Sequence, residues 1–192
     1  LLVGDDFRFG VQRKGDFALL QSLQSCYGYL LEILHSVEQN GVRISSSAIR
    51  EHLANGDLAQ ATLMLGHPST LSGHIIHGEK LGRTIGVPTI NIKMPERLAL
   101  QGIYAASVQL QSAPEQIIQG AASIGIRPSV KTNGQCWCEV HLFDFNQEIY
   151  GQIACVTLHQ KIRDEAKFDD FDELLKAIQN DIVQCRTFFA QT

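Results

Sequence analysis

The chain has 192 residues, of which 44% are hydrophobic and 19% are charged, and its formal net charge is −4. This length accommodates one large domain or two small ones. The acidic balance argues against a general nucleic-acid surface, which needs an excess of basic residues, so no nucleic-acid partner is expected. No apolar run approaches the ~20 residues of a membrane span, and the first residues lack the basic start and apolar centre of a secretory leader, so no membrane partner is expected.

The five cysteines are an odd number, scattered along the chain, which suits reduced thiols in a cytoplasmic protein better than a disulfide framework. Cys136 and Cys138 form a C-x-C pair on a predicted strand, so both thiols share one face. No further Cys or His lies nearby at the spacing of a zinc site. We therefore interpret the pair as small buried hydrophobic residues.

The first third of the chain has an α/β pattern. Residues 1–10 form an apolar strand that breaks into a Gly-Asp turn, as at the carboxyl end of a strand where ligands bind. Residues 15–37 predict a helix, but Gly28 and its aromatic neighbours make a strand at 29–34 an equal alternative.

Two short helices follow. The serines at 45–47 are expected to cap a helix that ends near Gly56. Asp57 is expected to start a second helix, Leu58 to Leu65, which Gly66 closes.

Two motifs in this segment resemble the FMN adenylyltransferase module of bacterial bifunctional FAD synthetases. These motifs are Val-Gly-x-Asp-Phe-x-Phe-Gly and Ile-Ser-Ser-Thr-x-Ile-Arg, with Ser47 here in place of threonine. The matching residues are Gly4, Asp6, Phe7, Phe9 and Gly10 in the first, and Ile44, Ser45, Ser46, Ile49 and Arg50 in the second. The H-x-G-H motif that precedes them in the family has no counterpart in this sequence. We therefore expect residues 1–68 to be a partial nucleotidyltransferase-like α/β segment that packs without making FAD, and the chain to be a fragment.

The most informative stretch is Gly73 to Asn91, GHIIHGEKLGRTIGVPTIN. An apolar run leads into a loop with glycines at 78, 82 and 86. Such loops expose backbone N–H groups that can cradle an anion, and Lys80 and Arg83 add positive charge there. The loop therefore predicts a phosphate site.

Thr89 and Asn91 follow this loop and stand two residues apart, so on an extended strand both side chains leave the same face. A hydroxyl and an amide carbonyl are hard oxygen ligands suited to Mg²⁺. As neutral ligands they are expected to hold free Mg²⁺ poorly, so the metal ion should arrive with ATP.

The glycine spacing matches neither the Walker loop nor the dinucleotide fingerprint. A Gly-rich hairpin followed by a Pro-terminated edge strand is the alternative that needs no ligand. The stretch resembles the riboflavin kinase family, whose hallmark is a glycine-rich flap followed by Pro-Thr-Ala-Asn. Ile90 replaces the alanine here, and its side chain is expected to point to the opposite face from the ligand pair.

From Ser72 onward, short apolar runs alternate with turn signals, which indicates an antiparallel barrel or sandwich. The expected strands are 72–77, 87–93, 102–110, 117–125, 135–144 and 150–159. Asn133-Gly134 is a strong hairpin signal between two of them. The fold class is therefore expected to be α+β, with residues 69–192 forming a six-stranded antiparallel barrel of the riboflavin kinase type plus a C-terminal helix.

The closing helix is expected to be capped by Asp169 or Asp170 and to carry one apolar stripe. The stripe comprises Phe171, Leu174, Leu175, Ile178, Ile182, Cys185 and Phe189. We interpret it as core packing, with its N-terminal end a candidate to face a ligand. The acidic residues at 169–173 lack the spacing of a calcium-binding EF-hand loop and are read as a helix cap.

Glu139 is the candidate catalytic residue, because a carboxylate in a strongly apolar strand is unfavourable unless it has a task or a partner. The family pattern Glu-x-His-Leu-x-Asp-Phe followed by Tyr-Gly is matched by Glu139, His141, Leu142, Asp144, Phe145, Tyr150 and Gly151. The resemblance implies that Glu139 is the base for the riboflavin 5′-hydroxyl. The alternative is a surface glutamate on an edge strand. His141 is either a partner of Glu139 or a structural histidine.

Two further stretches carry the resemblance. Arg127-Pro128 matches a family turn, and Arg163-Asp164-Glu165-Ala166-Lys167-Phe168 resembles the family's Arg-x-Glu-x-x-Phe, where the isoalloxazine ring is held. The resemblance places Arg163, Ala166 and Phe168 at the flavin. Without it, Arg163 and Glu165 would be an ordinary exposed ion pair.

Taken together, the resemblance implies ATP- and Mg-dependent phosphorylation of riboflavin to FMN, with riboflavin, ATP, FMN and ADP as the small-molecule partners. The flap residues Gly78, Lys80, Gly82 and Arg83 would contact the phosphates. The residues Leu142, Asp144 and Tyr150 would frame the nucleotide. The rival hypothesis is a barrel that binds flavin or nucleotide without catalysis.

Overall fold

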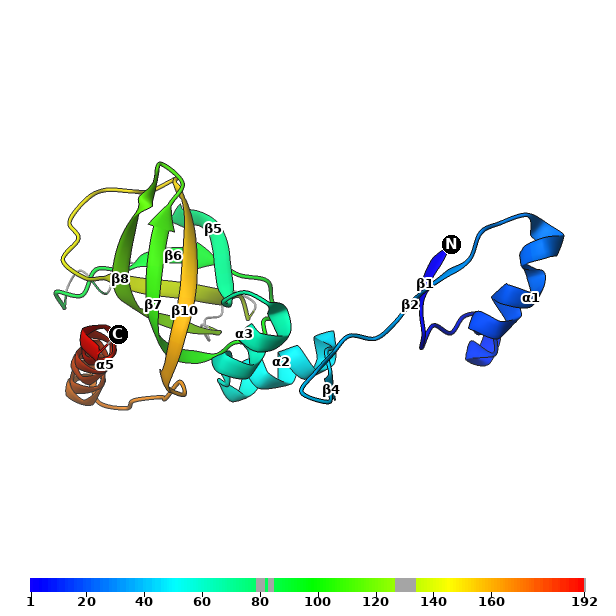
Figure 1. Ribbon diagram of the computed structural model, residues 1–192. Coiled ribbons are helices and arrows are strands. Elements are labelled where there is room, and N and C mark those ends of the chain that lie inside the picture. The colour runs from blue at the N-terminus through cyan, green and yellow to red at the C-terminus, as the bar shows by residue number, and fades with distance from the viewer. Residues whose placement is uncertain (79–81, 83–84, 127–133, 192) are drawn as a thin grey trace. The chain divides into compact units, whose positions relative to one another are not determined.

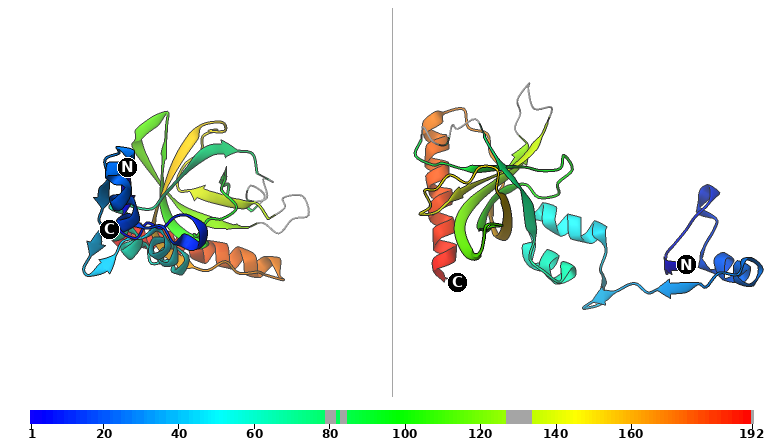
Figure 2. Two further views of the ribbon diagram at one scale, coloured as in Figure 1. Left: turned by 90° about the vertical axis from the view of Figure 1, so that its right-hand side faces the viewer. Right: turned by 90° about the horizontal axis from the view of Figure 1, so that it is seen from above.

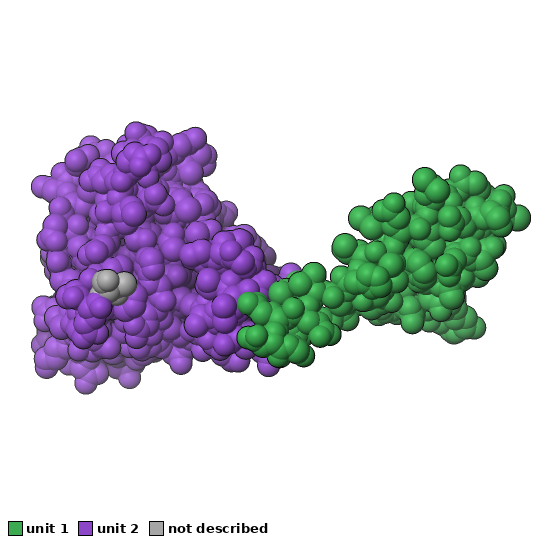
Figure 3. All heavy atoms as spheres, in the orientation of Figure 1, with its two compact units in different colours: residues 1–46 green, residues 47–192 purple. Residues whose placement is uncertain are grey.

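The computed structural model describes residues 1–78, 82, 85–126 and 134–191. The chain divides into two compact units, Leu1–Ser46 and Ser47–Thr192, shown in different colours in Figure 3. The first unit contains two small sheets, and the second contains a closed barrel. No helix within the described ranges is long and apolar enough to cross a membrane.

The first unit has the α/β pattern expected of it. Its elements are β1 (Leu2–Gly4), a 3-10 turn (Val11–Arg13), α1 (Phe17–Tyr27), β2 (Glu32–Leu34), β3 (Glu38–Gln39) and β4 (Val42–Arg43). Strands β1 and β2 pair in parallel, which requires a crossover such as α1 between them. Asp16 caps α1, and Gly28 ends it in the left-handed conformation. Each alternative for residues 15–37 therefore holds for one part: helix up to Tyr27 and strand from Glu32.

The second unit begins with the two predicted helices, α2 (Ser46–Asn55) and α3 (Leu58–Leu65). Asp57 caps α3 by accepting a hydrogen bond from Gln60 N at 3.1 Å, as expected. Leu58 and Ala61 are buried. The compact units separate at residue 46, ahead of these helices, and the domain boundary expected at residue 68 stays a prediction.

A closed six-stranded barrel forms the body of the second unit, confirming the expected fold class (Figures 1 and 2). Its strands are β5 (Thr70–Ile76), β6 (Ile90–Lys93), β7 (Gly102–Leu110), β8 (Ala113–Ile126), β9 (Cys136–Leu142) and β10 (Ile153–Arg163). Each overlaps one predicted strand. The order around the barrel is β10-β5-β6-β9-β8-β7, with every pair antiparallel. Of the predicted Asn133-Gly134 turn, Asn133 lies outside the described residues.

The alternation of strand β9 shows which face of the barrel is the core. Cys136, Cys138, Val140 and Leu142 are buried and belong to the interior cluster. The residues between them are only half-buried and point outward, because successive side chains leave opposite faces of a strand. Burial raises the pKa of Cys138 to about 12, as expected of an inert core thiol. Glu139 therefore stands on the outer face of the barrel wall.

Helix α5 (Phe171–Gln191) lies against this outer face (Figure 1). Of the two candidate caps, Asp170 accepts a hydrogen bond from Asp172 N at 2.9 Å. The C-terminal half of the helix packs in a second apolar cluster around Ala105, Phe143 and Cys185. This packing confirms the core role predicted for that half of the apolar stripe.

Candidate functional site

Strand register aligns several polar side chains into one row on the outer face of the barrel. Asn91 of β6 is opposite Glu139 of β9, which is opposite Ser123 of β8. The row continues through Ile103 of β7 to Arg163 of β10. Directly opposed residues share one face of a sheet, so neighbours in this row can be as far apart in sequence as Ile103 and Arg163, which are 60 positions apart.

A cavity of about 500 Å³, here called the larger cavity, lies between this row and the N-terminal half of α5. Six predicted site residues line it: Gly82, Thr89, Glu139, Arg163, Ala166 and Phe168. Helix α5 contributes an apolar wall of Phe171, Leu174, Ile178 and Ile182, so the N-terminal half of the stripe faces a cavity rather than the core. An apolar cavity with a few polar groups is typical of a small-molecule site.

A second cavity of about 370 Å³, here called the smaller cavity, lies between the Pro88–Ile90 segment and the loop after β9. Leu142 and Tyr150, both predicted to frame a nucleotide, line it. The Tyr150 ring packs on that of His77, with 3.8 Å between the ring centroids. Thr89 lines both cavities and is the one described residue that they share.

Asp144, the third residue predicted to frame the nucleotide, is engaged elsewhere. Its exposed carboxylate forms two hydrogen bonds of 3.0 Å with the guanidinium of Arg186 on α5, and this partner lowers the pKa of Asp144. Arg186 also lies 4.4 Å from the ring centroid of Phe143. Sequence analysis did not identify Arg186, because its partners are more than 40 residues away.

The flap glycines permit a close approach of backbone to the Thr89-Asn91 segment. A Cβ atom at Gly78 would lie 2.6 Å from Asn91 Oδ1, and one at Gly82 would lie 2.3 Å from the carbonyl oxygen of Val87. Val87 N also donates to Gly82 O at 2.8 Å. Any larger residue at either glycine would push these segments apart. The predicted flap residues Lys80 and Arg83, and Arg127-Pro128, lie outside the described residues.

The donor set at Thr89 and Asn91 fits a hard cation that brings its own negative ligands. Asn91 is 4% exposed, its Nδ2 donates to Thr89 O at 3.3 Å, and its whole amide group lies beside the position of the Cβ that Gly78 lacks. The Thr89 hydroxyl lies 3.8 Å from the position of the Cβ that Gly82 lacks. In the described part of the chain no cluster of three or more His, Cys, Asp or Glu side chains could hold a metal ion. Neutral oxygen donors are therefore the candidates.

Arg163 is held by a buried partner rather than by Glu165. Its Nε and Nη2 donate to Asp181 of α5 at 2.8 and 2.7 Å, and its Nη1 donates to Asp164 O at 2.9 Å. Asp181 is 5% exposed. The guanidinium lies 5.8 Å from the ring centroid of Phe168. Sequence analysis missed Asp181, although a carboxylate flanked by Ile178 and Ile182 on an apolar stripe is a signal that could have found it.

Glu139 is half-buried and faces the larger cavity from its place in the row between Asn91 and Ser123. His141, on the same face, has Nδ1 2.9 Å from Pro88 O, so the ring N–H donates to this carbonyl. This bond ties β9 to the residue before Thr89, which is a structural role. Glu165 also lines the larger cavity, and its pKa is raised by burial and by the negative charge of Glu139, against the opposing effect of Arg163.

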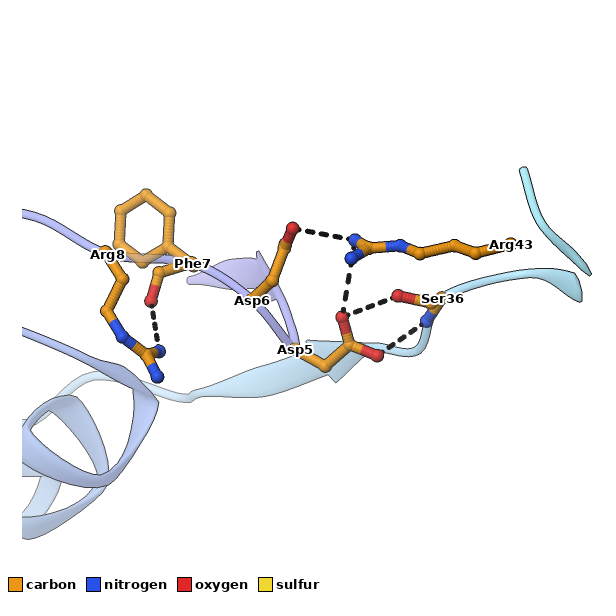
Figure 4. Close-up of polar contacts among 6 residues, drawn as sticks. All are labelled: Asp5, Asp6, Phe7, Arg8, Ser36 and Arg43. Carbon is orange, nitrogen blue, oxygen red and sulfur yellow. Dashed lines mark hydrogen bonds and ion pairs between the residues drawn. The ribbon is translucent and has the colours of Figure 1, made fainter. Parts of the chain in front are cut away.

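Two of the predicted adenylyltransferase residues, Asp6 and Phe7, lie in the turn after β1 (Figure 4). Asp5 accepts hydrogen bonds from Ser36 N and Oγ at 2.8 and 2.7 Å, and Asp6 pairs with Arg43 at 2.7 Å. The Ser36 bonds lower the pKa of Asp5. Phe7 stacks on Phe9 with 5.6 Å between the ring centroids. These contacts join the β1 turn to the segment after β2, and Arg43 had not been identified from the sequence.

The other predicted residues of this segment lie in the turn or at the start of α2. Gly4 ends β1, and Ser45 immediately precedes α2. Ser46 is the first residue of that helix, and Arg50 is its fifth. Helix α2 therefore begins within the serine run 45–47 that was expected to cap it.

Residues 65–189 match the riboflavin kinase family, and residues 1–48 match the FAD synthetase family. The bifunctional riboflavin kinase/FMN adenylyltransferase of Haemophilus influenzae is 46% identical over 98% of this chain, and that of Escherichia coli K12 is 44% identical over 100%. The chain spans 61% of the length of each. A crystal structure described as a macrolide-efflux protein from Streptococcus pneumoniae is 33% identical, covers 93% of this chain and 57% of its own, and has a TM-score of 0.68. With the barrel and its closing helix matched almost throughout, the chain belongs to the riboflavin kinase family.

Proposed function

We propose that this chain transfers a phosphoryl group from ATP to the 5′-hydroxyl of riboflavin, forming FMN. The observation that carries the proposal is that Thr89 lines both the larger cavity, which Glu139 also lines, and the smaller one. Phosphoryl transfer requires two substrates to be positioned in line, and two cavities that share one wall residue support such an arrangement.

Riboflavin occupies the larger cavity in this proposal. The apolar wall of α5 and the ring of Phe168 receive the isoalloxazine ring, and Ala166 leaves room beside it. Arg163 is oriented by Asp181 and lies 5.8 Å from the ring centroid of Phe168. The 5′-hydroxyl then points toward Glu139 and toward Thr89, which lines both cavities.

Glu139 accepts the proton of the 5′-hydroxyl as the hydroxyl oxygen attacks the terminal phosphorus of ATP. A primary alcohol is a weak nucleophile, and a carboxylate within hydrogen-bond reach both orients it and removes its proton. The bond from phosphorus to the bridging oxygen breaks, and ADP leaves from the smaller cavity. There Leu142 and Tyr150 frame the nucleotide.

Thr89 and Asn91 hold the Mg²⁺ that accompanies ATP, while Gly78 and Gly82 let the flap backbone approach the phosphates. The metal ion, when bound, neutralises charge on the phosphate oxygens. By family resemblance Lys80 and Arg83 add positive charge on the flap, and Asp144 borders the nucleotide. Because the Asp144 carboxylate is paired with Arg186, we propose that Asp144 acts indirectly, by fixing the position of the loop after β9.

The direct test is to incubate the full chain with riboflavin, ATP and Mg²⁺ and to separate the flavins by chromatography. FMN without FAD is expected, because the sequence contains no H-x-G-H motif. Riboflavin that is bound but unchanged would overturn the kinase proposal in favour of a binding module. Formation of FAD would contradict the expectation that residues 1–68 cannot carry out the adenylyltransferase reaction.

Glu139→Gln tests the role of the base. The rate of FMN formation is expected to fall by ~10²–10⁴-fold, the usual contribution of a positioned general base. Glu115→Gln, an exposed carboxylate on β8, is the matched control and should retain the wild-type rate. A Glu139→Gln variant with near wild-type turnover would remove Glu139 from the mechanism.

A further inference from the structure

The carboxylate of Glu165 occupies a place that a side chain on β8 would otherwise fill. A Cβ atom at Gly125 would lie 1.9 and 2.0 Å from its two carboxylate oxygens. Gly125 is buried, stands two residues beyond Ser123, and therefore shares the outer face of the barrel with it. Glu139 is directly opposite Ser123, so Gly125 is its diagonal neighbour. Diagonal positions of this kind are roughly 7–8 Å apart.

This position places a second carboxylate in the larger cavity beside Glu139, and the described residues leave its hydrogen-bonding capacity unused. Arg163, the cation that acts to lower the pKa of Glu165, is committed to Asp181 through Nε and Nη2. Within the described ranges no hydrogen bond or ion pair involves the Glu165 carboxylate. Partial burial and the charge of Glu139 raise its pKa, which marks an environment that is short of donors. An ionised carboxylate only accepts hydrogen bonds, so the ligand that suits it carries donors.

We propose that Glu165 is a specificity-determining residue whose carboxylate, seated over Gly125, accepts hydrogen bonds from the secondary hydroxyls of the flavin's polyol chain. The inference rests on riboflavin binding in the larger cavity, as proposed above. With C–C bonds of about 1.5 Å, a five-carbon chain extends about 5 Å. With a hydrogen bond of about 2.8 Å at each end, a chain of this length reaches a carboxylate one diagonal step from Glu139 when its terminal hydroxyl is at Glu139. The ring lies beyond it, against the apolar wall of α5.

Gly125 contributes to the same polyol-binding site, because its missing side chain leaves the space that the Glu165 carboxylate occupies. Its backbone is not in the positive-φ region, so alanine introduces no backbone strain there. The atoms nearest to the added methyl group all belong to the end of the Glu165 side chain. Gly125→Ala therefore displaces the carboxylate without removing it.

The test is to titrate riboflavin and lumiflavin, which has the same ring but a methyl group in place of the polyol, by flavin fluorescence. Hydrogen bonds to a charged group contribute about 1.5–3 kcal/mol, so Glu165→Gln and Gly125→Ala should raise the Kd for riboflavin roughly 10–100-fold. The Kd for lumiflavin should stay within about twofold, since a ligand without hydroxyls loses no such bond. Glu173→Gln, an exposed carboxylate in the first turn of α5, should leave both Kd values unchanged.

A double variant checks that the two residues act together. Glu165→Ala removes the obstructing carboxylate, so adding Gly125→Ala to it should cause no further loss of riboflavin affinity. Equal weakening of both flavins by Glu165→Gln, or no weakening of either, would overturn the inference. The assay needs no turnover. A chain that binds riboflavin with this selectivity but forms no FMN would refute the kinase proposal and leave the role of Glu165 supported.

Discussion

Asp181→Ala is the variant whose consequence follows most directly from the structure. The substitution removes a 5%-exposed carboxylate that accepts two hydrogen bonds from Arg163, at 2.8 and 2.7 Å, and leaves a guanidinium that is 27% exposed without its partner. Breaking a buried ion pair in this way costs about 3–5 kcal/mol. Because Arg163 keeps some contact with water, we expect the lower end, about 3 kcal/mol.

For a unit of about 150 residues, each kcal/mol lowers Tm by roughly 2–4 °C, so Asp181→Ala should lower the Tm of the barrel by about 10 °C. Thermal and urea unfolding followed by circular dichroism measure the loss. Asn180→Ala, an exposed neighbour on the same helix, is the control and should change stability by less than about 0.5 kcal/mol.

A second variant separates loss of the pair from loss of packing. Replacing both partners, as Arg163→Met with Asp181→Leu, should recover much of the stability, because no charge is then left unpaired. A loss below about 1 kcal/mol in Asp181→Ala would refute the reasoning. A double variant as unstable as Asp181→Ala would show that packing, not the charge, accounts for the loss.

Three further predictions concern the metal pair, the flap and His159. Thr89→Val with Asn91→Leu should keep the fold but abolish FMN formation. Residual turnover, or tight Mg²⁺ binding without nucleotide by calorimetry, would contradict the assignment. Gly78→Ala should lower kcat/KM for ATP at least ~10-fold, because its Cβ would displace the Asn91 amide. An unchanged value would show that the close contact between Gly78 and the Asn91 amide does not matter for the use of ATP. Burial lowers the pKa of His159, so the unfolded chain binds more protons and stability should fall as pH drops below about 6.5. His159→Gln should remove this slope in urea titrations at pH 7.5 and 5.5, and an unchanged slope would assign it to other groups.

Local patterns along the chain were sufficient for the elements of the barrel. Each of its strands alternates or runs apolar between turn signals, so the period of two and the breaks identify all six. The caps of α3 and α5 were found in the same way, because Asp57 and Asp170 act on residues two or three positions away. The region 15–37 was ambiguous because Gly28 separates a helix from a strand, and neither period extends across both.

The family motifs identified the candidate chemistry of this chain, because Thr89, Asn91 and Glu139 each stand in a short run that carries its own signal. Closure of the barrel decided what surrounds them. Pairing of β7 with β10 brings Arg163 into the row that contains Glu139, and packing of α5 supplies Asp181 and the apolar wall. The Glu165 carboxylate fits against β8 only because the strand has a glycine, Gly125, at that point. These contacts join residues 18 to 60 positions apart, where no period or spacing links them, and so they are decided by tertiary packing alone.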